Sequence, residues 1–455
     1  MVRVLGVELR RSAAPLLGVV VLVIALVVLR MGPPNSGSVT WTRQWGMLAE
    51  WVRFPLMFSW PVVVGLGALQ GLRDRRSGVE ELFASTPRPR AHRALALLGA
   101  LGIGVVTAQL VVTAIGAVRV DGYWQWSWLL VLLVGLVALV AAAWLGAGLA
   151  RLVPSPLTPP VLAVGALVLV ATALRVGDLD DDAPSGLVLR LTLLRPSTPS
   201  PRDVFHEPAG SFTLAQGLFY AGLALTAFLL LAARKWWQAL LPVVLAAAVA
   251  VPLMPGTPEE VRVASAVAMS EVCTDSGPRV CLTRAHGHEL AEVAGPAQEA
   301  LRQLAKLPDP PRSVREKPGP VWSASREAEP TDVVWINLDE LNYFLINEPA
   351  RGEELTKRMV AGAGTRPCHG MASPEDPTRE IAARTVAGSW VAGRLVPLLS
   401  PQSWYAKDVD ALVGPAWEAL RALPEQEQVA RVQAMRAVQG ACSGDPLTAL
   451  TSGAL

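Results

Sequence analysis

The sequence predicts an all-α polytopic membrane protein with about seven transmembrane helices, followed by a mainly helical α+β domain outside the cytoplasm. The first of three observations is composition, because 52% of the 455 residues are hydrophobic and only 17% are charged. The second is segregation: long apolar runs fill residues 1–254, whereas residues 255–455 have the charge density of a soluble domain. The third is that all four cysteines lie in that second part. These patterns predict a membrane half and a globular half.

Seven apolar runs are long enough to cross the hydrocarbon core, which needs about 17–25 residues. Six of them belong to a predicted membrane domain over residues 1–235, and the seventh is a further helix over residues 236–254. The first run follows a basic N-terminus but precedes no small-residue cleavage site, so we expect an anchor instead of a signal peptide. Four prolines interrupt the fifth run. The runs are residues 13–29, 54–72, 94–118, 128–150, an uncharged stretch between Arg151 and Arg175, 213–233 and 236–253.

The distribution of basic residues predicts a cytoplasmic N-terminus. With that orientation, the cytoplasmic segments hold 12 Lys and Arg residues in about 40 positions, against 8 in about 70 positions of the external loops. Tryptophans expected at the membrane interface precede the second and fourth runs, at Trp41, Trp45, Trp51, Trp124, Trp126 and Trp128. An odd number of crossings then places residues 255–455 outside, in a multi-pass protein of the cell membrane.

The cysteines agree with this orientation. An even number of cysteines confined to one soluble domain is typical of an oxidising, extracytoplasmic compartment with two disulfides. The four cysteines allow three pairings. We expect Cys273 to pair with Cys281, closing the segment CTDSGPRVC, and Cys368 to pair with Cys442.

The membrane half lacks residues that several classes of transporter need. No Asp, Glu, Lys, Arg or His falls inside the predicted spans, which argues against a carrier coupled to protons or sodium ions. The chain also contains no phosphate-binding loop of the form G-x-x-x-x-G-K-[ST], so energy for transport would come from another subunit. The net charge of +2 and the lack of a basic tract give no indication of a nucleic-acid partner.

The loop over residues 73–93, RDRRSGVEELFASTPRPRAHR, is the most distinctive part of the membrane half. It holds six arginines in 21 positions and no apolar run long enough to enter lipid. Ser77 followed by Glu80 forms a capping box, and Pro87 cannot continue a helix. The sequence therefore predicts a short helix over residues 78–85 at the cytoplasmic membrane surface.

This loop resembles the first cytoplasmic loop of ABC-type exporter permeases of the ABC-2 superfamily. In that family a charged run, a Gly, an acidic-apolar helix, a Pro and an Arg lie between spans two and three. In those permeases the segment is a coupling helix that docks on a separate ATPase subunit. The matching positions are Asp74, Gly78, Glu81, Leu82, Phe83, Thr86, Pro87 and Arg90.

The resemblance covers about residues 1–235 and implies a six-span unit with its N-terminus inside. It also implies a homodimer or a related permease subunit as partner, beside a cytoplasmic ABC ATPase that binds the ATP. Glu80 departs from the family, which often has an apolar residue there. The larger departure is the seventh span and the external domain, a fusion that looks like a variety found in GC-rich bacteria.

The external domain shows apolar residues near a 3.6 period in five segments. We expect helices at residues 290–307, 351–361, 378–399, 409–423 and 425–439. The best strand is residues 333–338, and the proline-rich residues 308–320 are expected to form a linker or an exposed loop. The apolar side of the 378–399 helix is expected to pack in the core.

Two alternatives weigh against this interpretation. His286 and His288 near Cys273 and Cys281 could form a zinc site, but an external location favours a disulfide and surface histidines, so no metal ligand is assigned. The acidic residues Asp178, Asp180, Asp181 and Asp182 could form a calcium site, but such a site needs ligands at alternating positions, a Gly-mediated turn and a distal Glu, so a solvated stretch is expected.

The favoured function is a permease subunit without catalytic residues or a cofactor of its own, embedded in the lipid bilayer. The alternative is a membrane-anchored external binding or enzymatic module.

Overall fold

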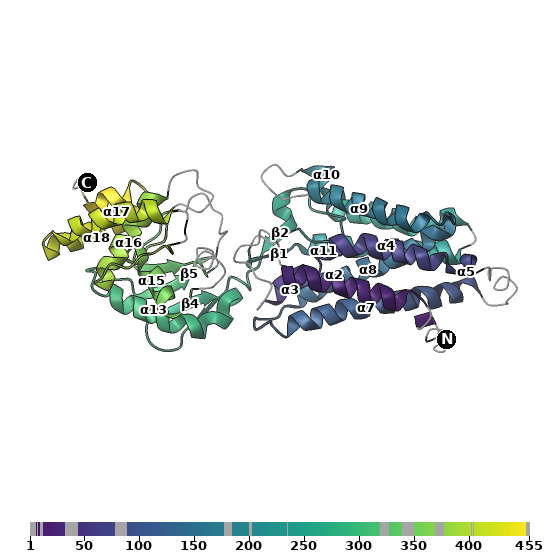
Figure 1. The fold of residues 1–455 in the computed structure, drawn as a ribbon, viewed down its shortest axis with the longest axis horizontal. Helices are drawn as coiled ribbons and strands as arrows, with labels where there is room; N and C mark the ends of the chain where they lie inside the picture. The colour runs from purple at the N-terminus through teal and green to yellow at the C-terminus, as the bar shows by residue number, and fades with distance from the viewer. Residues whose placement is uncertain are drawn as a thin grey trace. The chain divides into compact units, whose positions relative to one another are not determined.

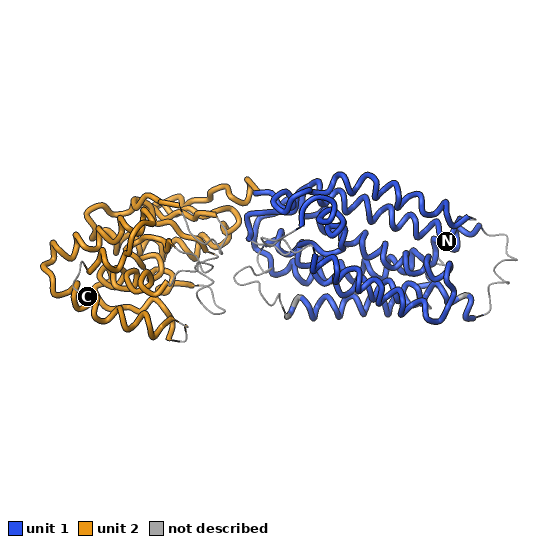
Figure 2. The backbone as a smooth tube through the Cα atoms, turned by 90° about the horizontal axis from the view of Figure 1, so that it is seen from above, with its two compact units in different colours: residues 1–36, 40–264 blue, residues 37–39, 265–455 orange. Residues whose placement is uncertain are grey.

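The computed structural model divides the chain into two units, one that ends at Ala264 and one that continues from Ser265 (Figure 2). Each unit has its own hydrophobic core. The structure describes residues 6, 8–9, 12–31, 44–77, 89–176, 184–199, 203–233, 235–318, 327–338, 350–368, 377–401, 403 and 405–451.

The first unit is a bundle of apolar helices with a two-stranded ribbon at one end (Figure 1). Its helices in chain order are α2 (Ala14–Met31), α3 (Trp45–Trp51), α4 (Leu56–Gly71), α5 (Arg73–Arg76), α7 (Arg90–Ala117), α8 (Trp126–Leu152), α9 (Thr158–Val176), α10 (Gly186–Thr192), α11 (Gly210–Ala232), the 3-10 helix η1 (Trp236–Leu240), α12 (Leu241–Leu253) and the 3-10 helix η2 (Pro258–Val261). The antiparallel ribbon consists of β1 (His206–Pro208) and β2 (Arg262–Ala264).

Five helical segments among the described residues are long and apolar enough to cross a membrane, namely α7, α8, α9, α11 and the run Trp236–Leu253. The helices α3 and α4 qualify together as a sixth, bent by 42° at their junction. The helix α2 is apolar but shorter by the same measure. The predicted helical fold with membrane-compatible helices is confirmed, whereas seven crossings stay a prediction. In the fifth run, Pro159 and Pro160 lie in the first turn of α9, where a missing N–H group is tolerated.

Close contacts between backbones hold α4 against α8 at the centre of the bundle. A Cβ atom added to Gly67 would lie 2.2 Å from the carbonyl oxygen of Ala143, and one added to Gly146 would lie 2.0 Å from that of Val64. Small residues allow such approaches, which is how helices associate tightly where lipid removes the hydrophobic driving force. The backbones of α4 and α8 are therefore in direct contact at Gly67 and Gly146.

Substitution of Gly146 by alanine is expected to destabilise the bundle by about 1–3 kcal/mol, because the added methyl group must push α4 away from α8. Gly165 in α9 is a matched control, since nothing lies within 4 Å of a Cβ atom added there. Thermal unfolding of the two alanine variants in the same detergent measures the difference. Equal midpoints would contradict the packing described here.

Different elements form the two ends of the first unit (Figure 1). At one end the start of α2 meets the end of α4, where the Ala13 N–H group donates to Gln70 Oε1 over 3.0 Å. The ribbon, α3 and a group of aromatic rings lie at the opposite end. There the Trp45 and Trp124 ring centroids are 5.0 Å apart.

The second unit combines a four-stranded sheet with helices. The strand order is β3 (Glu271–Cys273), β4 (Arg279–Thr283), β5 (Ser313–Glu316) and β6 (Val333–Ile336), with β3 antiparallel to β4 and the other neighbours parallel. The helices are the 3-10 helix η3 (Arg284–Glu289), α13 (Leu290–Leu304), α15 (Gly352–Val360), the 3-10 helix η4 (Ala361–Ala363), α16 (Thr378–Ala392), α17 (Ala406–Arg421), α18 (Glu425–Ala441) and α19 (Pro446–Thr451).

Two expectations for the second unit were wrong in detail. The proline-rich segment expected as a loop contains the strand β5, whose Val314 and Glu316 are both buried in the unit. The helix expected to reach residue 399 ends at Ala392, because Gly393 adopts the left-handed conformation with φ of 76° that terminates α16. The other four expected helices correspond to α13, α15, α17 and α18.

The four cysteines form the two predicted pairs. Cys273 and Cys281 lie directly opposite each other in the β3–β4 register and are joined. Cys368, after η4, is joined to Cys442 at the end of α18. The prediction of disulfide bonds within residues 255–455 is confirmed.

Candidate functional site

The predicted coupling segment lies mostly outside the described residues. This holds for the helix expected at residues 78–85 and for Gly78, Glu81, Leu82, Phe83, Thr86 and Pro87. Asp74 lies in α5, and Arg90 is the first residue of α7.

The flanks of this segment show how the bundle presents it. The helix α5 follows α4 after Leu72, and the Arg73 guanidinium donates to the Glu8 carboxylate over 3.0 Å. Arg75, Arg76 and Arg90 are exposed. The loop therefore leaves and re-enters the bundle at the same end, next to the start of α2, and it is bordered by exposed arginines.

A buried polar cluster occupies the opposite end of the first unit, and sequence reasoning missed it. We define this polar cluster as Glu50, Arg53, Asp203, Gln216, Tyr220 and Arg262, all of them buried. The cluster surrounds the junction between α3 and α4. Polar groups at such depth are costly unless they are paired, so their partners indicate what they do.

Glu50 and Arg262 form a buried ion pair across 212 positions of sequence. The two terminal nitrogens of Arg262 donate to the two carboxylate oxygens of Glu50 over 2.7 and 2.9 Å. Arg262 Nη2 also donates to the backbone oxygen of His206 over 2.7 Å. Burial alone lowers the pKa of Arg262, but the adjacent Glu50 carboxylate raises it above the ordinary value, so Arg262 is charged. The pair ties α3 to the β1–β2 ribbon.

Asp203 orders the approach to the ribbon. Its Oδ1 atom accepts hydrogen bonds from the backbone N–H groups of Phe205 and His206 over 2.8 and 3.0 Å. The same oxygen lies 2.8 Å from Nδ1 of the His206 ring. The carboxylate thereby shapes the turn into β1 and holds the backbone oxygen of His206 where Arg262 can reach it.

Arg53 lies in the junction between α3 and α4 and is completely buried. Its Nη2 atom donates to the backbone oxygen of Pro196 over 3.0 Å and to Gln216 Oε1 over 2.7 Å. Gln216 in turn donates to the backbone oxygens of Leu193 and Arg195. The junction is thus bound to α11 and to the segment after α10 by a chain of hydrogen bonds.

Two nitrogens of Arg53, Nε and Nη1, have no hydrogen-bond partner among the described residues. The nearby Glu50 carboxylate acts on this guanidinium through its charge, but the ion pair that it forms among the described residues is with Arg262. The side chain lies against Gly135 of α8, where an added Cβ atom would come within 3.1 Å of Arg53 Cγ. Glycine at position 135 is what leaves room for the arginine inside the bundle.

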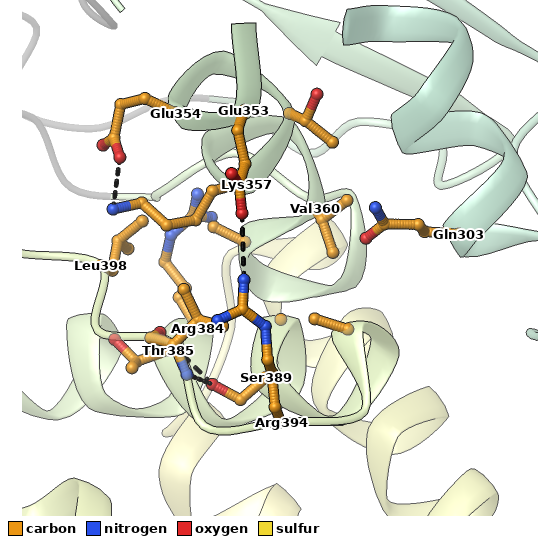
Figure 3. A pocket seen from close by; sticks show the side chains of 15 residues that line it. Gln303, Glu353, Glu354, Lys357, Val360, Arg384, Thr385, Ser389, Arg394 and Leu398 are labelled. Atoms are coloured by element: carbon orange, nitrogen blue, oxygen red, sulfur yellow. Dashed lines mark hydrogen bonds and ion pairs between the residues drawn. The ribbon is translucent and has the colours of Figure 1, made fainter.

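The second unit contains a pocket of about 530 Å³ between α15, α16 and the segment that follows α16 (Figure 3). Its charged lining residues form ion pairs, Glu353 with Arg394 over 2.9 Å and Glu354 with Lys357 over 2.5 Å. Arg384 and Ser389 are buried members of the lining. The helix α16 therefore serves both the expected core packing, through its apolar residues, and this pocket.

The residues considered for a zinc site are engaged elsewhere. The sulfurs of Cys273 and Cys281 are joined to each other, and His286 Nδ1 lies 2.5 Å from Glu316 Oε1. The other carboxylate oxygen of Glu316 accepts hydrogen bonds from the backbone N–H and the hydroxyl of Thr283. The four residues Asp178, Asp180, Asp181 and Asp182 lie outside the described residues.

The buried Glu316 predicts that the second unit loses stability in acid. Burial raises the pKa of Glu316, but the His286 ring and the Thr283 hydrogen bonds outweigh it and lower the pKa below the ordinary value. A lowered carboxyl pKa contributes stability above about pH 4.5 that is lost as the pH falls through the folded pKa. We expect Glu316→Gln to unfold more easily than the wild type at pH 7, with a difference that shrinks between about pH 5 and pH 3.

Glu418→Gln is the matched control, because this glutamate is exposed on α17. Thermal unfolding of the full chain across this pH range measures both variants. A difference between Glu316→Gln and wild type that stays constant with pH would contradict the assignment of an ionised, buried carboxylate.

Comparisons with known proteins give no match, since no protein-family model, curated protein or solved structure matches the chain.

Sequence reasoning missed the polar cluster because it assigned four of its members to three different external segments and the other two, Gln216 and Tyr220, to the sixth apolar run. Glu50 and Arg53 fell in the loop before the second run, and Arg262 fell in the external domain. The available signal was the spacing Glu-x-x-Arg directly before an apolar run, at Glu50 and Arg53. Neither partner could be identified from it, because Arg262 and Gln216 are more than 160 positions away.

Proposed function

We propose that the first unit is the membrane-spanning permease subunit of an ABC-type exporter, energised by a separate cytoplasmic ATPase that docks on residues 73–93. The observation that carries this proposal is the basic loop between α4 and α7, whose sequence resembles the coupling segment of such permeases. The exposed arginines that border the loop, Arg75, Arg76 and Arg90, are consistent with a cytoplasmic surface. The missing phosphate-binding loop means that the nucleotide is bound by the partner.

The arrangement of α4 and α5 suggests how movement of an ATPase would reach the other end of the bundle. The two helices follow each other over residues 56–76, which corresponds to a rod of about 30 Å. One end of this rod borders the docking loop, and the other begins at the junction that holds Arg53. A force on the loop would tilt the rod against α8 and open the junction toward the outside.

The proposed topology places the basic loop and the N-terminus in the cytoplasm and residues 255–455 on the extracytoplasmic side of the membrane. The disulfides of the second unit support this orientation, because they persist in oxidising compartments. The helices α9 and α12 bury few of their residues within the chain. Their outer faces would contact lipid or the second permease subunit of a dimer.

The test is affinity purification of the intact protein in mild detergent, followed by mass spectrometry of the proteins that co-purify. We expect an ATPase with a phosphate-binding loop to be recovered with the wild type and lost when Glu81 and Phe83 are both changed to arginine. A matched control changes Trp126, which is exposed at the opposite end of the bundle, to arginine and should retain the ATPase. Recovery of the ATPase with both variants, or its absence from every sample, would contradict the proposal.

The alternative function, a membrane-anchored binding module, has one observation in its favour, the pocket of about 530 Å³ in the second unit. This volume is within the range of small-molecule sites. A small ligand that co-purifies with the wild type and is lost when Arg384 is changed to glutamine would favour this function, in particular when no ATPase co-purifies.

A further inference from the structure

Arg53 is the only side chain of the polar cluster with more than one nitrogen lacking a partner among the described residues. A guanidinium carries five N–H groups, and Nη2 supplies the two that reach Pro196 and Gln216. The three N–H groups of Nε and Nη1 remain without a described acceptor. Buried donors are nearly always paired, so this exception requires an explanation.

The positive charge of Arg53 also has no hydrogen-bonded counter-charge among the described residues. Its acceptors are a backbone carbonyl and an amide oxygen, which are neutral. The neighbouring carboxylate, Glu50, is bound by both terminal nitrogens of Arg262. A cation inside an apolar bundle is costly without a counter-charge, and ionisable groups at such positions commonly contact the ion or substrate that passes.

Arg53 lies where the helical backbone of the bundle is interrupted. It lies at the 42° bend between α3 and α4, where Gln109 Nε2 donates to the backbone oxygen of Val52 over 3.0 Å. On the α8 side it meets Gly135, which has no side chain to cover the guanidinium stem. A small opening of this bend would expose Nε and Nη1 without breaking an ion pair.

We propose that Arg53 binds an oxyanion, a phosphate group, when the junction between α3 and α4 opens. The inference deepens the proposed permease function and rests on it for one point, namely that the exported substrate carries such a group. Arginine suits this task because its planar donors match the oxygens of a phosphate group and its charge is not lost on burial. The phosphate group belongs either to a water-soluble anion or to the headgroup of a lipid.

The experiment measures binding of two probes to the full chain in dodecyl maltoside, a detergent without a phosphate group. Radiolabelled orthophosphate tests a soluble source, and phosphatidate added to the detergent solution, counted by native mass spectrometry, tests a lipid source. We expect one of the two to bind the wild type. Arg53→Gln should weaken that binding about ten- to hundredfold, the effect of losing a charge-assisted hydrogen bond.

Arg119→Gln is the matched control, because it removes one positive charge from an exposed position at the same end of the bundle. It should bind the probe as the wild type does. Should Arg53→Gln fail to yield monodisperse protein, Gly135→Ala decides instead, since its methyl group displaces the arginine while keeping the charge. We expect Gly135→Ala to weaken binding as well.

Three results would overturn the inference: binding of neither probe, equal binding by Arg53→Gln, or equal loss in Arg119→Gln. Recovery of the partner ATPase from the same preparations separates the two proposals. If the ATPase is recovered with both the wild type and Arg53→Gln, and the two proteins bind the probe equally, the anion site is rejected and the permease proposal is not. With probe binding lost in Arg53→Gln and the ATPase absent throughout, the permease proposal fails and the anion site remains.

Discussion

Replacing Glu50 by alanine is expected to destabilise the first unit by about 3–5 kcal/mol, the cost of leaving one partner of a buried ion pair uncompensated. Arg262 would keep its charge in a buried position and retain only the backbone oxygen of His206 as a bonded partner. The β1–β2 ribbon would then lose its attachment to α3. Thermal unfolding of the protein in nanodiscs, followed by the fluorescence of the tryptophans near α3, measures the effect.

A double variant separates the ion pair from other roles of these residues. Glu50→Arg combined with Arg262→Glu restores opposite charges across the same contact, and we expect it to regain part of the stability that either single change removes. Strictly additive losses in the two single variants and the double variant would contradict a direct interaction between the two side chains.

Removal of the Cys368–Cys442 disulfide by serine substitution is expected to destabilise the second unit by about 4.5 kcal/mol. The two cysteines are 74 positions apart, and a longer closed segment restricts the unfolded chain more. Removal of the Cys273–Cys281 disulfide, with a separation of 8 positions, is expected to cost only about 2.5 kcal/mol on the same basis.

Limited proteolysis of the two double-serine variants, compared with the wild type, tests which disulfide stabilises the second unit more. Cleavage within residues 265–455 should be much faster in the Cys368 and Cys442 variant than in the other. The reverse order would show that local contacts, such as the bond from the Cys368 N–H group to Glu380 Oε1 at 2.5 Å, determine the stability instead of chain restriction.

Much of the fold could be predicted because its signals are local. The apolar runs that became α7, α8 and α11 are long enough to be unambiguous, and the 3.6 period of Leu290–Leu304 identified α13. The expected pairing of Cys273 with Cys281 closes only the short segment CTDSGPRVC. These features depend on neighbours in the sequence and need no knowledge of the tertiary structure.

The features that could not be predicted depend on contacts between distant segments. The strand β5 is four residues long and flanked by prolines, so only its parallel pairing with β4 and β6 makes it a strand. The polar cluster depends on Glu50 meeting Arg262 and on Arg53 meeting Gln216. Charged residues next to an apolar run are usually solvated, and only the folded bundle shows that these are buried.

The most direct test of the permease account is photo-crosslinking in living cells, with benzoylphenylalanine placed at position 83 in the coupling segment or at position 126 at the opposite end. The account predicts that the probe at position 83 is crosslinked to a cytoplasmic ATPase with a phosphate-binding loop and that the probe at position 126 is not. Crosslinks from position 83 to proteins outside the cytoplasm, or to no ATPase at all, would contradict it.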